Sequence, residues 1–167
     1  LDTTVGQWDA KTGTELPKLS LRHPDSVLTM KLIPNQRRVV TSCSVLKRGS
    51  GTDGKVSEVA ESHLVVWNID TAQSELEITP FRGDVFSMDV STDGTSLVGA
   101  NSTDRTVRKW DLTSGAEVQS PQRDGKLGPL IDLKQSGGLL WSVAFRPQSE
   151  DVLTVGGSDG RLWKTRN

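Results

Sequence analysis

Three stretches of the chain alternate between apolar and polar positions. They are DSVLTMKLIPNQ, GDVFSMDVSTDG and GGLLWSVAFRPQ. Side chains on a β-strand point to opposite faces in turn, so a period of two predicts strands with one buried face each. The apolar trios expected on those faces are Leu28, Met30 and Leu32; Phe86, Met88 and Val90; and Trp141, Val143 and Phe145. Turn residues follow each stretch, and then comes a second apolar run, which reads RRVVTS, TSLVGA or DVLTVG.

A second pattern, built around tryptophan, recurs four times. The segments are DTTVGQWDAKTG, ESHLVVWNIDTA, DRTVRKWDLTSG and the shorter DGRLWKTRN. Their tryptophans are Trp8, Trp67, Trp110 and Trp163, and each segment predicts a strand that enters a hairpin. Together with the alternating stretches, they predict a repeated four-stranded antiparallel meander. The 43 residues from Trp67 to Trp110 match the period of one propeller blade.

Composition supports an all-β fold. Turn signals from 16 glycines and 7 prolines recur throughout the chain, and no stretch has a clear helical period. The formal net charge is −1, and no apolar run approaches the roughly 20 residues that span a bilayer, so we expect neither nucleic acid nor a membrane as partner. The single cysteine, Cys43, excludes an internal disulfide and a multi-cysteine zinc site.

We expect no metal and no cofactor, because the two histidines have no Cys, Asp and Glu grouping at metal-ligand spacing. The expected location is the cytoplasm, with the nucleus and the extracellular space left open. The chain starts at Leu1 without an initiator methionine, so we also expect that a segment upstream is missing.

The motifs WDAKTG, WDLTSG, VFSMDVSTDG and LLWSVAFRP resemble the WD-repeat β-propeller family, and the resemblance covers nearly the whole chain. It implies an incomplete arc of four-stranded antiparallel blades that acts as a non-catalytic scaffold for protein–protein interaction. It also implies structural roles in the repeat for Trp8, Trp67, Trp110, Trp163, His23 and Asp104, with His23 as a hydrogen-bonding residue.

The chain departs from the family pattern at several positions. Arg22-His23 replaces a Gly-His pair, and Phe81 and Ser136 stand at the equivalent places in the next two units. Asn68 and Lys164 replace the aspartate that follows the tryptophan. We therefore expect blades that are held mainly by packing.

Spacing of the tryptophans divides the single domain, residues 1–167, into parts. We expect the end of one blade over 1–20, a blade over 26–80, another over 84–121 and the last over 138–164. Two intervals exceed one blade, and their surplus falls at 44–60, between the second and third strands of a blade, and at 122–138, between two blades. Because antiparallel strands alternate in direction, both insertions are expected on one rim.

These insertions combine mixed charge with a short apolar run, LGPLIDL, which suits a protein interface with apolar anchors and charged contacts that set the register. The candidate partner-binding residues are Lys47, Arg48, Asp53, Lys55, Arg123, Asp124, Lys126 and Ile131. The same segments can equally be tolerated surface loops. The sequence leaves both interpretations open.

The first insertion contains GSGTDGKVS, which imitates a phosphate-binding loop at Gly49, Gly54 and Lys55. Val56 stands where the hydroxyl residue belongs, and no helix signal follows. A phosphate loop needs a helix N-terminus facing the anion. We therefore expect a flexible loop between two antiparallel strands here.

About three blades leave two apolar end faces uncovered, because closed propellers have four to eight. We expect the C-terminal part of a longer propeller, of about seven blades, whose other half is absent or lies in a separate chain. Association of copies is the alternative. Two other functions stay open: a regulatory or sensory module of a larger enzyme such as a kinase, and a small-ligand or enzymatic site in the central channel. For such a site the innermost strands offer only Lys31 and Asp89.

Overall fold

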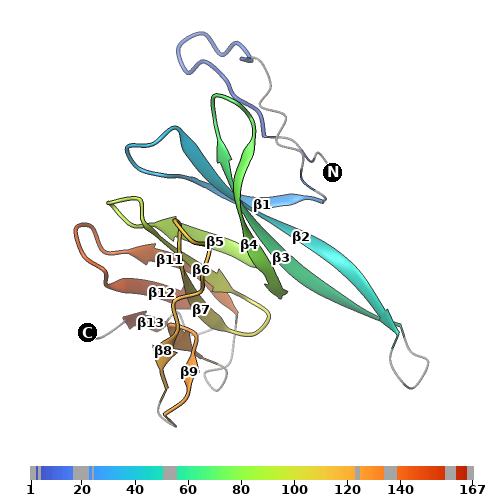
Figure 1. Ribbon diagram of the computed structural model, residues 1–167, viewed down its shortest axis with the longest axis vertical. Helices are drawn as coiled ribbons and strands as arrows, with labels where there is room; N and C mark the ends of the chain where they lie inside the picture. The colour runs from blue at the N-terminus through green and yellow to red at the C-terminus, as the bar shows by residue number, and fades with distance from the viewer. Residues whose placement is uncertain are drawn as a thin grey trace.

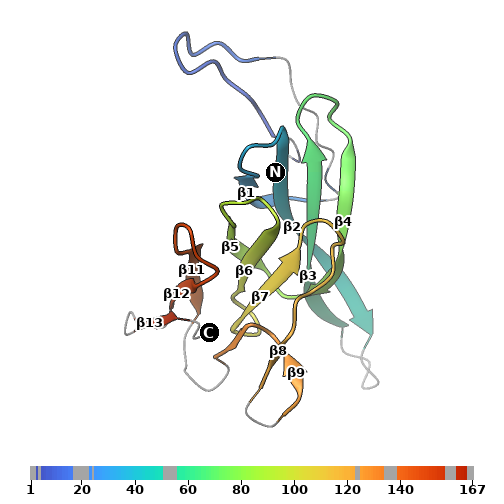
Figure 2. The ribbon, with the colours of Figure 1, turned by 60° about the vertical axis from the view of Figure 1, so that its left-hand side comes forward.

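Every regular element among the described residues of the computed structural model is a β-strand (Figure 1). The structure describes residues 3, 5–16, 23, 25–50, 56–122, 125–133, 139–156 and 161–164. The strands form three larger antiparallel sheets in succession and one small two-stranded sheet, which Figure 2 shows from a second side. The predicted all-β fold, an incomplete arc of propeller blades, is confirmed.

The first sheet has four strands in sequence order. They are β1 (Val27–Leu32), β2 (Arg38–Ser50), β3 (Val56–Asn68) and β4 (Ser74–Arg82). β2 and β3 are long because they continue past β1 as a paired ribbon, from Ser44 opposite Ser62 to Ser50 opposite Val56. Most of the expected 44–60 loop is therefore strand, which the alternation of valine and leucine with polar residues favours.

The second sheet has a divided outer strand. Its main strands are β5 (Val85–Val90), β6 (Ser96–Asn101) and β7 (Thr106–Asp111). Beyond β7, Glu117 forms a bridge with Trp110, and β10 (Ile131–Asp132) later pairs with the start of β7. Between these two segments the chain leaves the sheet as a hairpin of β8 (Ser120–Pro121) and β9 (Leu127–Gly128). The second insertion thus interrupts an outer strand, whereas we expected it between two blades.

The third sheet consists of β11 (Leu140–Phe145), β12 (Val152–Gly156) and β13 (Arg161–Lys164). Trp163 lies in β13, but its side chain lies outside the described part of the chain. β5 contacts β1 on one side and β11 on the other, so the first strand of each sheet lies next to the first strand of its neighbour.

Successive sheets pack through the same pair of faces. On the second sheet, Val90, Leu97 and Trp110 stand opposite one another across β5, β6 and β7. This row joins a buried cluster with apolar side chains of the first sheet, among them Val40, Leu64, Val66 and Ile78. The other face of the second sheet packs in the same manner against Leu140, Val143, Phe145 and Val152 of the third sheet.

Each innermost strand begins with a β-bulge. The register shifts between Val27 and Thr29, between Val85 and Ser87, and between Leu140 and Ser142. The extra residue in the last two cases is Phe86 or Trp141, and both side chains are exposed, while Val85 and Leu140 are buried. The prediction that Phe86 and Trp141 line a buried face is wrong, because an inserted residue shifts the alternation between the two faces.

The predicted burial of Met30 and Leu32 is also wrong, since both side chains are exposed. They lie on the face of the first sheet that points away from the second sheet. No sheet among the residues that the structure describes covers the inner part of this face.

The polar turn after tryptophan has the same construction in three repeats. It begins at Asp9, Asn68 or Asp111, whose Oδ1 accepts hydrogen bonds from the backbone N–H groups two and three residues later. For Asp111, the Thr113 hydroxyl and the N–H groups of Ser114 and Thr113 lower the pKa of the carboxyl to about 2. Asn68 keeps the turn because an amide oxygen accepts hydrogen bonds as a carboxylate does.

An aromatic ring lies against the tryptophan of each of the first two sheets. Trp67 Nε1 donates to Thr41 Oγ1 (2.9 Å), and His23 Nε2 lies 3.1 Å from the same oxygen. The His23 and Trp67 rings meet edge-on, with centroids 5.0 Å apart, and Phe81 stands 5.1 Å from Trp110. His23 Nδ1 is buried without a hydrogen-bond partner among the described residues.

We expect His23→Phe to reduce the sensitivity of the fold to mild acid. Burial lowers the pKa of the His23 imidazole from its usual 6.5. A group whose pKa is lower in the folded state stabilises the fold above its unfolded pKa, and this contribution is lost as the pH falls through the folded pKa. Phenylalanine does not titrate, and Phe81 shows that a phenyl ring packs well in such a position.

The measurement is urea unfolding of both proteins at about pH 8 and at about pH 5, on either side of the imidazole's usual pKa. The loss of stability between the two pH values should be smaller in His23→Phe than in the parent chain. An equal loss in both proteins would show that His23 does not cause the acid sensitivity.

Candidate interaction surface

Both extra segments of the chain extend toward the same end of the molecule, the lower end in Figures 1 and 2. We call this end the insertion rim. It comprises residues 44–50 and 56–61 of the β2–β3 ribbon, residues 118–122 and 125–130 around the β8–β9 hairpin, and the first residues of β5 and β11.

The base of the ribbon is clamped to the chain that links the first sheet to the second. Gly83 N–H donates to Ala60 O (2.8 Å), and the Ser44 hydroxyl donates to the Asp84 carboxylate. Farther out, Lys47 Nζ and Glu61 Oε2 form an ion pair of 2.6 Å across the two strands. The ribbon therefore leaves the sheet as a fixed extension at its base, and the Leu46 side chain is exposed beyond the clamp.

The β8–β9 hairpin is closed by one glutamine. Gln122 Nε2 donates to Ser120 O (2.9 Å) and to Pro129 O (2.8 Å), so one side chain joins β8 to the residue that follows β9. Leu127 on β9 is exposed. The hairpin thus presents an apolar side chain on a stem with defined geometry.

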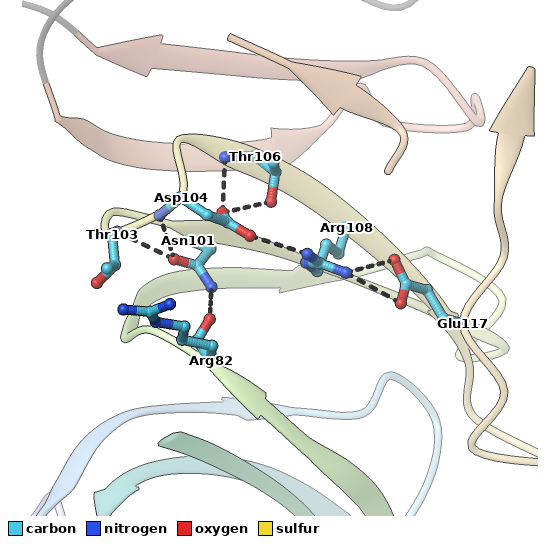
Figure 3. A network of polar contacts seen from close by, with 7 residues as sticks. All are labelled: Arg82, Asn101, Thr103, Asp104, Thr106, Arg108 and Glu117. Atoms are coloured by element: carbon cyan, nitrogen blue, oxygen red, sulfur yellow. Dashed lines mark hydrogen bonds and ion pairs between the residues drawn. The ribbon is translucent and has the colours of Figure 1, made fainter. Parts of the chain in front are cut away.

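A polar network fixes the turn between β6 and β7 (Figure 3). Asn101 Oδ1 accepts hydrogen bonds from the N–H groups of Thr103 (3.0 Å) and Asp104 (3.1 Å). Its Nδ2 donates to Arg82 O (2.8 Å), which ties the turn to the end of β4. Asp104 Oδ1 then accepts from the N–H (3.0 Å) and the hydroxyl (2.6 Å) of Thr106.

Arg108 extends this network to the outer strand, as Figure 3 shows. Its guanidinium donates to Asp104 Oδ2 (2.8 Å) and to both carboxylate oxygens of Glu117 (3.0 and 3.1 Å), and it lies 5.7 Å from the centroid of the Phe81 ring. Burial alone would lower the pKa of Arg108, but Asp104 and Glu117 outweigh burial and raise it. Asp104 is thus part of the internal support of the insertion rim.

Among the described residues of the insertion rim, five large apolar side chains are exposed. They are Leu46, Phe86, Val118, Leu127 and Trp141, and Trp141 is 63% exposed. Aromatic side chains bury a large area for little loss of conformational freedom, so they dominate the energetics of many protein interfaces. The bulges of β5 and β11 are what turn Phe86 and Trp141 outward.

The structure describes the side chains of three of the predicted partner-binding residues. Lys47 and Lys126 lie on the insertion rim, in the ribbon and in the turn of the hairpin. Ile131 lies in β10, where it is half-buried against the cluster between the second and third sheets. Arg48 lies in β2, with its side chain outside the described part, and the residues that lie wholly outside it are Asp53, Lys55, Arg123 and Asp124.

Sequence reasoning missed Leu46 and Val118 as exposed rim residues, and it placed two others, Phe86 and Trp141, on buried faces. Each of the latter two follows another apolar residue directly, in the pairs Val85-Phe86 and Leu140-Trp141. Two adjacent apolar residues at the start of an alternating strand break the period of two, and this doublet is the signal that indicates a bulge.

The phosphate-loop pattern of the first insertion has no supporting structure. β3 begins at Val56, directly after Lys55, so a strand follows where a phosphate loop needs a helix. The expectation that this segment joins two antiparallel strands is correct.

The two charged side chains of the innermost strands, Lys31 and Asp89, bind each other. Lys31 Nζ lies 3.0 Å from Asp89 Oδ1, and Asp89 Oδ2 accepts a hydrogen bond from Phe145 N–H (2.9 Å). These contacts join the innermost strands of all three sheets. In the described part of the chain, no three His, Cys, Asp or Glu side chains come together as a metal ion would require. None of the described segments is a helix that could cross a membrane.

Comparison with known proteins agrees with this geometry. Residues 75–111, from β4 to the end of β7, match the family model described as "WD domain, G-beta repeat". The chain therefore contains a WD repeat, and its resemblance to WD-repeat propellers is confirmed.

Two similar curated proteins are both named Autophagy-related protein 18, from Saccharomyces cerevisiae strains YJM789 and ATCC 204508 / S288c. Each is 24% identical to this chain over 109 residues, which is 65% of the chain. The chain spans 20% of the length of these relatives.

Proposed function

We propose that this chain is a non-catalytic WD-repeat scaffold that binds a protein partner through the insertion rim. The observation that carries the proposal is the set of exposed apolar side chains there, among them Leu46, Phe86, Leu127 and Trp141. Apolar anchors amid charged residues such as Lys47 and Lys126 are typical of a protein-binding surface.

The rigidity of the insertion rim supports the same function. The ribbon is clamped at Gly83 and Asp84, and the β6–β7 turn is held by Asn101 and Arg108. A surface that is ordered before binding loses less conformational entropy when a partner docks, so more of the contact energy appears as affinity.

The contacts between the innermost strands favour a scaffold over a small-ligand site in a central channel. Lys31 and Asp89 neutralise each other, and Asp89 also accepts the Phe145 N–H. A ligand that used either charge would first have to break the contacts that join neighbouring sheets.

The proposal is tested by affinity capture with the purified chain as bait in a lysate of its source organism, followed by quantitative mass spectrometry. A rim variant carries Leu46→Glu, Leu127→Glu and Trp141→Glu. We expect the proteins enriched by the parent chain to fall by at least about tenfold with this variant, because each lost anchor costs about 1–2 kcal/mol of binding. Titration calorimetry with the purified partner then measures the direct affinity.

A control variant places the same charge on the opposite end of the sheets, with Gln73→Glu, Thr92→Glu and Ala116→Glu, all at exposed positions. This control variant should capture the same proteins as the parent chain. If the rim variant and the parent chain enrich the same proteins to the same extent, partner binding does not involve the insertion rim.

A further inference from the structure

The sheets of this chain stack in one direction with a repeated contact. The face of the second sheet that carries Trp110 packs on the first sheet, and the equivalent face of the third sheet packs on the second. In each contact, the face that corresponds to the Trp110 face packs against the opposite face of the sheet that precedes it in the chain. Among the described residues, no sheet covers the face of the first sheet that carries Trp67, and none covers the opposite face of the third sheet.

The described residues cover the Trp67 face of the first sheet over its outer half. Val39, Val65 and Trp67 form a buried cluster against which Val5 packs. Over the inner half, on β1, Met30 is 44% exposed and Leu32 is 59% exposed.

The equivalent positions of β5 show how this inner half would be buried. There Met88 is 5% exposed and Val90 is 6% exposed, because the first sheet covers them. Met30 and Leu32 therefore form an apolar strip of the kind that packs against another sheet elsewhere in the same chain.

Two backbone donors of β1 point to an edge that no described strand occupies. Ile33 N–H donates to Arg38 O of β2, so the N–H groups of Leu32 and Met30 point the other way, to this edge. In β11 the equivalent N–H groups are those of Val143 and Phe145. They donate to Ser87 Oγ (3.1 Å) and Asp89 Oδ2 (2.9 Å) of the neighbouring β5.

At the other end of the arc, β11 carries the complementary acceptor position. Ser142 and Ala144 occupy on β11 the places that Ser87 and Asp89 occupy on β5, and both are exposed. Ser142 can thus offer its hydroxyl oxygen to the next innermost strand as Ser87 does to β11. No sheet among the described residues lies on this side of β11.

We infer that copies of this chain associate head to tail. In this association β11 of one copy lies beside β1 of the next copy, in the same way that β5 lies beside β11 within one copy. In this contact Ser142 Oγ of one copy accepts the Met30 N–H of the next, and Met30 and Leu32 are buried. The interface joins two different surfaces, so it is heterologous and closes only as a ring. Three sheets per copy give six in a pair, within the four to eight blades of closed propellers.

The first test is the mass of the purified 167-residue chain in solution, by analytical ultracentrifugation over a range of concentrations. The expected result is a mass of at least two copies, against 18.1 kDa for one. Met30→Glu with Leu32→Glu should reduce the mass to that of a single chain. Leu46→Glu with Leu127→Glu, which places equal charge on the insertion rim, should leave association unchanged.

A parent chain that stays at 18.1 kDa at every concentration overturns the inference. This is the result expected if a blade from another polypeptide segment is the natural cover of the Trp67 face. Association that survives the Met30→Glu, Leu32→Glu double substitution overturns it as well.

The second test remains valid if the double variant fails to fold. One preparation carries Met30→Cys and another carries Ser142→Cys, and each is oxidised alone and after mixing. The head-to-tail contact predicts a disulfide-linked dimer only in the mixture, because one cysteine comes from each of two different surfaces. Equal cross-linking in the separate preparations, or none in the mixture, contradicts the contact.

Discussion

Trp110→Ala should lower the free energy of unfolding by about 3–5 kcal/mol, the usual cost of removing a large buried aromatic side chain. Trp110 is 2% exposed and lies in the cluster between the first and second sheets. Its ring packs against Phe81, and a Cβ added to Gly99 would lie only 3.1 Å from it. Urea unfolding followed by circular dichroism measures the change.

Trp8→Ala is the matched control, because Trp8 begins the same kind of turn but is 60% exposed. Its effect on the unfolding free energy should be within about 0.5 kcal/mol, as for most surface substitutions. Similar losses for the two variants would mean that the shared turn motif, and not burial between sheets, determines the contribution of the tryptophan.

The second large effect is expected for Gly83→Ala, at about 3 kcal/mol of destabilisation from backbone strain and overpacking together. Gly83 has φ of +98°, and an added Cβ would lie 2.4 Å from Asn101 Oδ1. Asn101 cannot move away without breaking its bonds to Arg82 O and to the N–H groups of Thr103 and Asp104. The loss should appear both in thermal unfolding and as faster amide exchange in the β6–β7 turn.

Gly115→Ala is the control that separates the cost of backbone strain from the cost of the clash with Asn101. Gly115 also has positive φ, +74°, but the atom nearest to an added Cβ is Leu76 Cδ1 at 3.2 Å, at the end of a side chain that can shift. The expected cost is about 1 kcal/mol, from the backbone conformation alone. Equal destabilisation by the two substitutions would exclude the collision with Asn101 as the cause.

Alternation and the tryptophan spacing predicted the sheets because both depend on local chemistry. A strand with one buried face must alternate, and the turn after tryptophan needs an acceptor such as Asp111 or Asn68. The same local rule failed at Phe86 and Trp141, since a bulge adds one residue without changing the composition of the strand.

The shape of the insertions depended on pairing that the sequence does not show. Chain length placed a surplus near 44–60, but only the ladder from Ser44 to Ser50 against β3 makes that segment a ribbon. Similarly, the pairing of Val107 with Ile131 joins residues on either side of the β8–β9 hairpin. Long-range register of this kind is set by tertiary packing, which a count of residues cannot predict.

The divided outer strand of the second sheet also bears on how this protein can change over evolutionary time. Val118 N–H donates to Lys109 O on one side of the hairpin, and Ile131 pairs with Val107 on the other, so β7 keeps its outer neighbours whatever the chain does between them. Loop closure grows costlier only slowly with length. Residues 119–130 can therefore change in sequence and in length while the second sheet keeps its pairing.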